Sequence, residues 1–239
     1  MLPFLTAAAF LATPVIEQPA SYHLFADMRA FCGVSNFGDV FSNARFLCVG
    51  IFGLLQLRRH SGPAARSWAV MLAGVVLVSV GSAYYHLAPN NDTLVWDHLP
   101  MTFAFTAMTV AVVTEFVTDK FEKFALIPVV AVGAASVFVW HFTGDLRLYF
   151  SVQVASVTTV LFAIFAFGDA APHRVYILLA GSLYGSAIVA EQLDHEIYDL
   201  LFPTLSGHTI KHLLAAAGLL MFALRLRRMA KEKATAGKA

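Results

Sequence analysis

Histidine, serine and aspartate side chains stand at three places where apolar stretches of the chain begin or end. Ser82 and His86 close one stretch, Asp97 precedes the next, and His208 and His212 open the last. The final pair is spaced four residues apart, so on a helix both imidazoles point the same way, about 6 Å apart. Two histidines at this spacing are how a helix offers two ligands to one zinc ion.

These residues together indicate metal-assisted hydrolysis of an amide or ester. His86 supplies a third nitrogen ligand, and three protein ligands with one open tetrahedral position are typical of catalytic zinc sites. Thr209 stands where the helical zinc-protease motif HExxH has its glutamate, so the general base must come from another segment, and Asp97 is the candidate. Ser82 is the candidate for hydrogen-bonding the substrate carbonyl or the developing oxyanion. The alternative is that the last two histidines are core residues bonded to backbone or hydroxyl groups.

Other polar residues lie near these candidates in the sequence. His98 is expected to be an interfacial neighbour of Asp97. Glu191 and Asp194 either accept hydrogen bonds from a ligand histidine, and so orient it, or belong to a solvated acidic loop. Lys211 is expected to face away from the histidine pair, because neighbouring positions on a helix diverge from the face that the pair occupies. It would then either pair with one of the carboxylates at the end of the sixth span or extend to the membrane interface.

The elements that position these residues are predicted to be membrane helices. The chain has 239 residues, of which 59% are hydrophobic and only 13% charged, with a mean hydropathy of +0.71. This composition excludes an ordinary water-soluble enzyme, and the net charge of +1 with dispersed basic residues excludes nucleic-acid binding as a main role. A membrane span needs about 20 apolar residues. Seven stretches meet that test: 39–57, 67–86, 98–117, 123–140, 148–167, 175–192 and 207–226.

The predicted fold is therefore an all-α, polytopic membrane protein with a seven-helix bundle at residues 39–226. In an up-and-down bundle, the end of the second span and the starts of the third and seventh share one membrane face, which brings the candidate residues to a common depth. Residues 1–38 form a hydrophobic segment and a polar surface segment, and residues 227–239 form a basic tail. Residues 2–16 lack a preceding positive charge, which favours a short retained helix over a signal peptide.

The distribution of charge orients the bundle. Most of the 16 Lys and Arg residues lie on the side of the C-terminus, so the positive-inside rule predicts a cytoplasmic C-terminus. The candidate site then lies towards the non-cytoplasmic face. Nothing in the sequence indicates an obligate protein partner.

Three motifs resemble those of the alkaline ceramidase family, which belongs to the CREST superfamily of seven-span membrane hydrolases: Ser82-x-x-x-His86, Asp97-x-Leu99-Pro100-Met101 and His208-x-x-x-His212. The resemblance covers residues 39–226 and includes Ser42-Asn43. It implies a zinc-dependent enzyme that cleaves the amide bond of ceramide or a related N-acyl lipid, with the substrate entering from the bilayer.

The chain also departs from the family pattern. Asn36 stands where the calcium-binding segment of the family has a glutamate, which argues against calcium binding. The short loops and the N-terminal segment with few acidic residues resemble a bacterial member of the family. A receptor-like or lipid-sensing protein of the same superfamily, with a mainly structural metal site, is the main alternative. A haem-binding electron carrier needs histidines that face each other across a porphyrin, often with a second such pair, and the sequence shows none. A transporter is disfavoured because no pair of Gly- or Pro-broken spans recurs in the two halves of the sequence.

Overall fold

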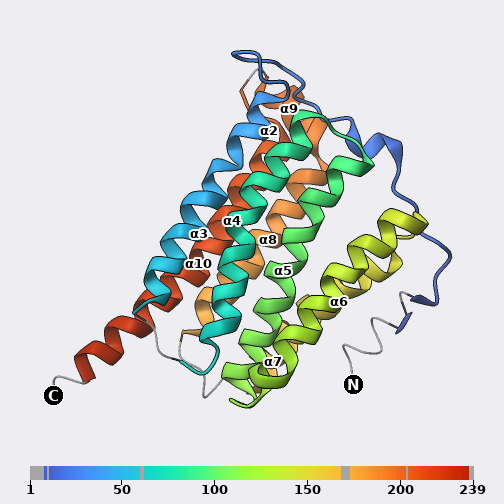
Figure 1. Ribbon diagram of the computed structural model, residues 1–239. Helices are drawn as coiled ribbons and strands as arrows, with labels where there is room; N and C mark the ends of the chain where they lie inside the picture. The colour runs from blue at the N-terminus through green and yellow to red at the C-terminus, as the bar shows by residue number, and fades with distance from the viewer. Residues whose placement is uncertain (1–7, 10, 60–61, 168–172, 203, 237–239) are drawn as a thin grey trace.

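The computed structural model describes residues 8–9, 11–59, 62–167, 173–202 and 204–236, and these residues form a helical bundle (Figure 1). Residues 2–7 and 10 of the predicted helix at residues 2–16 lie outside the described residues, and residues 12–16 are not helical. Seven helices of the described chain are long and apolar enough to cross a membrane, which confirms the predicted fold. The first is Phe37–Leu57, which joins α2 (Phe37–Ser42) and α3 (Ala44–Leu57). The others are α4 (Ala65–Leu87), α5 (Asn91–Phe116), α6 (Phe121–Thr143), α7 (Arg147–Phe167), α8 (Arg174–Gln192) and α10 (Gly207–Ala236).

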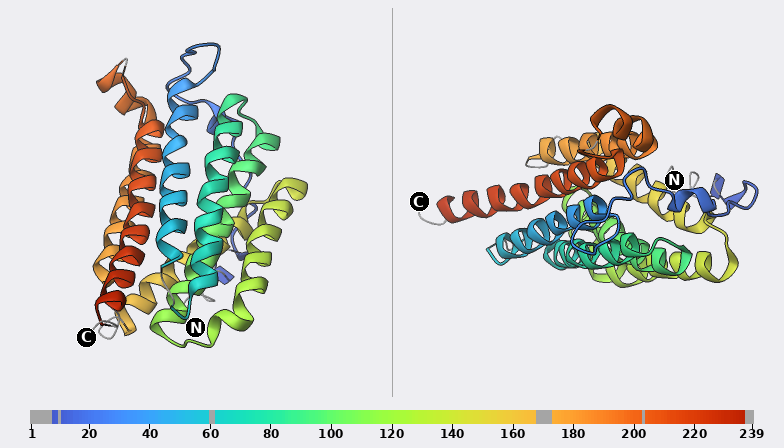
Figure 2. Two further views of the ribbon diagram at one scale, coloured as in Figure 1. Left: turned by 60° about the vertical axis from the view of Figure 1, so that its left-hand side comes forward. Right: turned by 90° about the horizontal axis from the view of Figure 1, so that it is seen from above.

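The helices pack mainly on their neighbours in sequence, with α10 closing the bundle. Helix α4 packs against α3 and α5, and α5 also contacts α6 and α7. Helix α10 packs against α8 and α3, so it joins the last part of the chain to the first (Figure 2). The short helix α9 (Asp194–Leu201) lies at the same end of the bundle as α2 (Figure 1). The end of α4 and the starts of α5 and α10 therefore meet at one end of the molecule.

Helix α5 begins earlier than the apolar pattern predicted. The Asn90 side chain accepts hydrogen bonds from the backbone N–H groups of Asp92 and Thr93, and the Thr93 hydroxyl accepts one from the Asn90 N–H. This capping box starts the helix at Asn91, within the polar loop, rather than at residue 98. Asp97 consequently lies inside a regular helix, almost two turns from its start.

The N-terminal segment covers this end of the bundle. It includes the 3-10 helix η1 (Ala20–His23), and several hydrogen bonds tie its backbone to the rest of the bundle. The N–H of Leu146 donates to the Ile16 carbonyl at 2.8 Å, and the N–H of Ala26 donates to Asp194 at 2.9 Å. The ring of Phe25 is buried against the histidines described below. This segment therefore forms part of the wall of the site.

Helices α4 and α5 approach closely next to the candidate serine. A Cβ added to Gly81 would lie 1.9 Å from the Trp96 carbonyl oxygen, so no larger residue fits without moving one helix. Ser82 and Asp97 directly follow these two residues in the sequence. The contact at Gly81 therefore sets the distance between their backbones.

We expect Gly81→Ala to lower the melting temperature and the activity together. The added methyl group must separate the two helices, and overpacking of this kind costs roughly 1–3 kcal/mol. Gly185→Ala in α8 is the matched control, because a Cβ there meets nothing within 4 Å. Thermal unfolding of the two purified variants measures the difference. A Gly81→Ala protein as stable as the Gly185→Ala protein would contradict the tight contact.

Candidate metal centre

Three buried histidines from two helices meet at the end of the bundle. His86 is the penultimate residue of α4, and His208 and His212 lie in the first turns of α10. Their ligand atoms all lie within 4.8 Å of one another. The ring centroids are 4.8 Å apart for His86 and His208 and 5.0 Å apart for His86 and His212. The structure thus brings together the three residues that the sequence singled out as metal ligands.

Hydrogen bonds orient His212 towards the centre of this group. Its Nδ1 lies 2.6 Å from the Ser42 hydroxyl, which itself donates to the backbone carbonyl of Asp39 at 2.8 Å. Because the serine proton is used for the carbonyl, Nδ1–H of His212 must be the donor in the first bond. Its Nε2 is then the deprotonated nitrogen and is available as a ligand. A histidine that donates its other N–H to an oxygen is the usual arrangement in metal sites.

The other two histidines are fixed through their backbones. The Asn36 side-chain amide donates to the His86 carbonyl at 2.8 Å, and the His208 N–H donates to Asp194 at 2.7 Å. The ring of Phe25 packs on both imidazoles, with centroids 4.7 Å and 4.5 Å away. The buried Nδ1 of His86 has no hydrogen-bond partner within the described part of the chain. Three buried, neutral imidazoles with an unpaired nitrogen are a donor set that fits a zinc ion.

Asp97 and Ser82 lie beside the histidines in the wall of the same cavity. Both residues are buried, and their side chains are hydrogen-bonded to each other across the contact between α4 and α5. Ser82 precedes His86 by one helical turn, so the two residues share a face of α4. The five candidate residues therefore gather in one place.

Ser82, Asp97 and His212 line a cavity with a volume of about 890 Å³. Its polar part lies at the histidine end, with Ser82, Asp97 and His212 in its wall. From there it extends between α5, α7, α8 and α10, where its wall is made almost entirely of apolar side chains. This shape suits a ligand with one polar end and a long hydrocarbon part.

Lys211 lines this cavity near the histidines, which corrects the prediction that it faces away from them, whereas its expected pairing with a carboxylate is confirmed. Its ammonium group pairs with the Glu191 carboxylate at the end of α8, and Glu191 lies 4.0 Å from Nδ1 of His208. The packing of α8 on α10 draws the lysine towards the carboxylate. The Tyr22 hydroxyl of the covering segment donates to the same carboxylate at 3.4 Å. Burial, together with the charge of Glu191, raises the pKa of Tyr22 well above its usual value, so its hydroxyl remains a donor.

His98 was expected at the membrane interface, but it is buried in the cavity wall. Its ring stacks on Tyr149 with centroids 4.4 Å apart and also contacts Trp140. The extended start of α5 explains the difference, because it places His98 inside the bundle instead of at its rim. His98 does not belong to the histidine group that surrounds the candidate metal position.

Asp39 contributes to the site but was not singled out from the sequence. Asp39 is fully buried in α2 and accepts a hydrogen bond from the Thr209 hydroxyl at 2.7 Å. It therefore ties the start of the first span to the α10 turn that carries the metal-ligand candidates. Asp39, Ser42 and Asn43 are spaced three and four residues apart in an apolar span, and this spacing is the signal that would have marked them as one inward-facing group.

The segment around Asp27 is held together by the chain's own groups. Burial acts to raise the pKa of Asp27, but hydrogen bonds from Arg29 outweigh it and hold this pKa below its usual range. The Arg29 guanidinium lies 2.7 Å from the Asp27 carboxylate. Asn36 holds the backbone of His86 as described above. These residues thus serve to place the covering segment against the site.

Comparison with known proteins agrees with this geometry. The model of the Ceramidase family matches residues 31–182, which is more than half of the chain. The chain belongs to the ceramidase family. The match includes Ser82, His86 and Asp97, whereas His208 and His212 follow it in sequence and join the site through the fold. Searches among curated proteins and among solved structures returned no match.

Proposed function

We propose that this ceramidase-family protein is a zinc-dependent membrane hydrolase that cleaves the amide bond of ceramide or a related N-acyl lipid. One observation carries the proposal. Three buried histidines and a buried carboxylate–serine pair meet at the polar end of a long apolar cavity inside a bundle of membrane-length helices. Ionisable groups are expensive at such depth, so their gathering in one cavity indicates a functional site.

His86, His208 and His212 would hold the zinc ion. Zinc in such a site acts as a Lewis acid and lowers the pKa of a water molecule to near 7. The chain itself fixes the imidazoles in advance, because Ser42 orients the ring of His212 and Asp194 holds the backbone of His208. The apolar wall of the cavity keeps bulk water away from these groups.

Asp97 is the proposed general base and acid. Its carboxylate accepts the proton of the attacking water as the water oxygen bonds to the amide carbon. When the carbon–nitrogen bond breaks, the same carboxylic acid returns the proton to the amine nitrogen, which leaves a fatty acid and a free amine. Ser82 donates its single hydroxyl proton to the Asp97 carboxylate in the free protein and so orients it. On binding of the substrate this proton would turn to the substrate carbonyl oxygen, which leaves the carboxylate free to accept the proton of water.

The orientation and substrate route belong to the same proposal. The basic residues near the C-terminus favour a cytoplasmic tail and a site towards the non-cytoplasmic face. The cavity lies among membrane-length helices, which favours a lipid that enters from the bilayer. Residues 39–226 form the membrane domain, with residues 1–38 and 227–239 as its flanking segments.

The test is mass spectrometry of a lipid extract incubated with the purified wild-type protein and with His212→Ala. We expect the wild-type protein alone to consume ceramide or other N-acyl lipids and to release fatty acid and the matching amine. Equal lipid profiles in the two samples would contradict hydrolysis and would favour a lipid-sensing role for the same cavity.

A further inference from the structure

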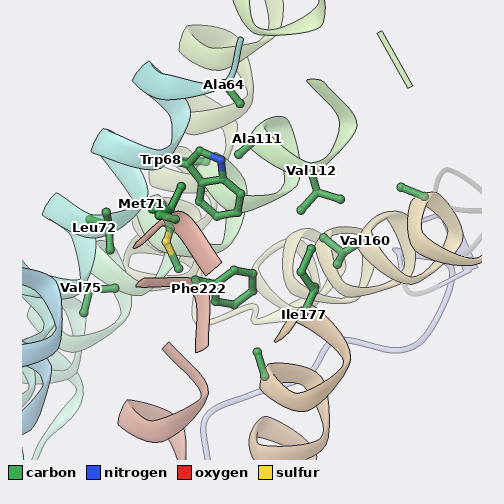
Figure 3. Close-up of a cluster of buried hydrophobic side chains, with 14 of the residues drawn as sticks. Ala64, Trp68, Met71, Leu72, Val75, Ala111, Val112, Val160, Ile177 and Phe222 are labelled. Atoms are coloured by element: carbon green, nitrogen blue, oxygen red, sulfur yellow. The ribbon is translucent and has the colours of Figure 1, made fainter. Parts of the chain in front are cut away.

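The deep end of the cavity is closed by a group of large side chains near the opposite end of the bundle. Phe222 of α10 lies there in the cavity wall together with Met71, Ile164 and Ile177. These residues belong to the buried hydrophobic cluster, and Figure 3 shows Met71, Ile177 and Phe222 converging in it. The cavity therefore has a floor of fixed position.

A buried polar contact supports this floor from below. The ring of Trp68 packs on Phe222 with centroids 5.6 Å apart, and its Nε1 donates to Glu115 at 2.7 Å. Arg225, which is 1% exposed, pairs with the same carboxylate at 2.7 Å and lies over the Trp68 ring. A buried ion pair within a membrane helix is costly. Its evident structural effect is to hold Trp68, and through it Phe222, in one place.

The distance from the histidines to the floor matches a lipid chain. Phe222 follows His212 by ten residues of the same helix, which is about 15 Å at 1.5 Å per residue. Half of the bilayer hydrocarbon core is also about 15 Å. The apolar part of the cavity thus has the length of one extended hydrocarbon chain of a membrane lipid.

The polar groups at the other end indicate which chain of the substrate enters. Lys211, Glu191 and Tyr22 gather donors and acceptors at the histidine end of the cavity. In an N-acyl lipid the amine half carries the polar head group, so this half must stay at the polar end. The acyl half has no head group and is free to extend into the apolar depth.

We propose that the apolar cavity binds the fatty acyl chain of the substrate and that Phe222, backed by Trp68, sets the longest chain accepted. This inference rests on the proposed hydrolysis for its reaction but not for its binding site. The chain extends from the carbonyl at the histidine end towards Phe222, beside the side chains of α7 and α8. A chain longer than the cavity must bend or displace Phe222, which lowers its rate of cleavage.

The test measures kcat/KM for a series of N-acyl sphingoid bases whose saturated acyl chains increase in length. The wild-type rate should rise with chain length and then fall beyond a limit. Phe222→Ala should move the limit to longer chains and raise the ratio of long-chain to short-chain rates about tenfold or more, the scale on which apolar pockets discriminate. Leu219→Phe, which adds bulk to the cavity wall one turn above Phe222, should move the limit to shorter chains.

Controls separate this effect from a general loss of structure. Phe165→Ala removes a phenyl ring at similar depth, but this ring is 74% exposed and faces away from the cavity wall, so the chain-length profile should not change. If Phe222→Ala does not fold, Phe222→Leu provides a smaller change in the same direction. If Phe222→Ala instead moved the length limit only in a series that varies the chain of the amine half, the assignment of the cavity to the acyl chain would be overturned.

A second readout is independent of the reaction. Free fatty acids of the same chain lengths should raise the melting temperature of the wild-type protein up to a limiting length, and Phe222→Ala should extend that limit. Length-dependent binding without hydrolysis of any substrate would support the acyl site while contradicting the proposed function. Hydrolysis with the same length limits in wild type, Phe222→Ala and Leu219→Phe would overturn the acyl site alone.

Discussion

Replacement of Asp97 by Asn is expected to lower turnover by about 10²–10⁴-fold, the range for loss of a general base, while the protein keeps its metal. The amide has nearly the same shape as the carboxylate, but it cannot accept a proton from water at neutral pH. Ser82 can still hydrogen-bond the new side chain, so the packing between α4 and α5 should persist. The measurement is the rate of fatty acid release, together with the zinc content of the purified variant.

Asp92→Asn is the matched control for this substitution. Asp92 lies on the same helix but is exposed, in the first turn of α5. We expect this variant to retain wild-type turnover. An Asp97→Asn protein with turnover close to that of Asp92→Asn would remove Asp97 from its proposed role, and loss of zinc in Asp97→Asn would make it a ligand instead of a base.

Removal of the metal is the second change with a large expected effect. Incubation with a zinc chelator should reduce fatty acid release to background and lower the melting temperature, because an ion that binds only the folded protein stabilises it by mass action. Added zinc should restore both properties. Calcium and magnesium should restore neither, since these ions prefer oxygen ligands and the site offers three imidazoles.

The measurement follows activity and melting temperature in the same samples, with the metal content of each sample determined in parallel. Full activity in protein shown to be free of zinc would contradict a metal-dependent reaction. Restoration by calcium alone would assign the metal to a different site.

The fold was predictable because membrane spans depend on length and hydropathy, and both can be read from one sequence. The end of the helix that carries His86 was also placed within one residue, at residue 86 where α4 ends at Leu87. The start of α5 was not, because the capping box at Asn90 uses polar side chains that do not contribute to an apolar pattern. That error of seven residues explains why His98 was expected at the interface and is in fact buried.

The candidate site was partly predictable for a related reason. His208 and His212 share a helix face, so their spacing alone places them together, and the shared membrane face of three spans brings His86 and Asp97 to the same depth. The pairing of Lys211 with a carboxylate at the end of α8 was one of two expectations, but sequence spacing could not show that this pair lies beside the histidines. The hydrogen bond from His212 to Ser42 likewise joins residues 170 positions apart.

Arg225 illustrates a further limit of reasoning from composition. As a basic residue near the C-terminus, it contributed to the predicted orientation in the same way as its exposed neighbours. In the structure it is buried, with its guanidinium against Glu115 and Trp68. Only these contacts with side chains of α4 and α5 distinguish Arg225, which supports the cavity floor, from basic residues that are exposed.

Elemental analysis of the purified protein tests the central claim most directly. The account predicts close to one zinc ion per chain in the wild-type protein and none above background when His86, His208 and His212 are all replaced by Ala in a protein that remains folded. Wild-type protein without stoichiometric metal, or a triple variant that retains as much zinc as the wild type, would contradict it.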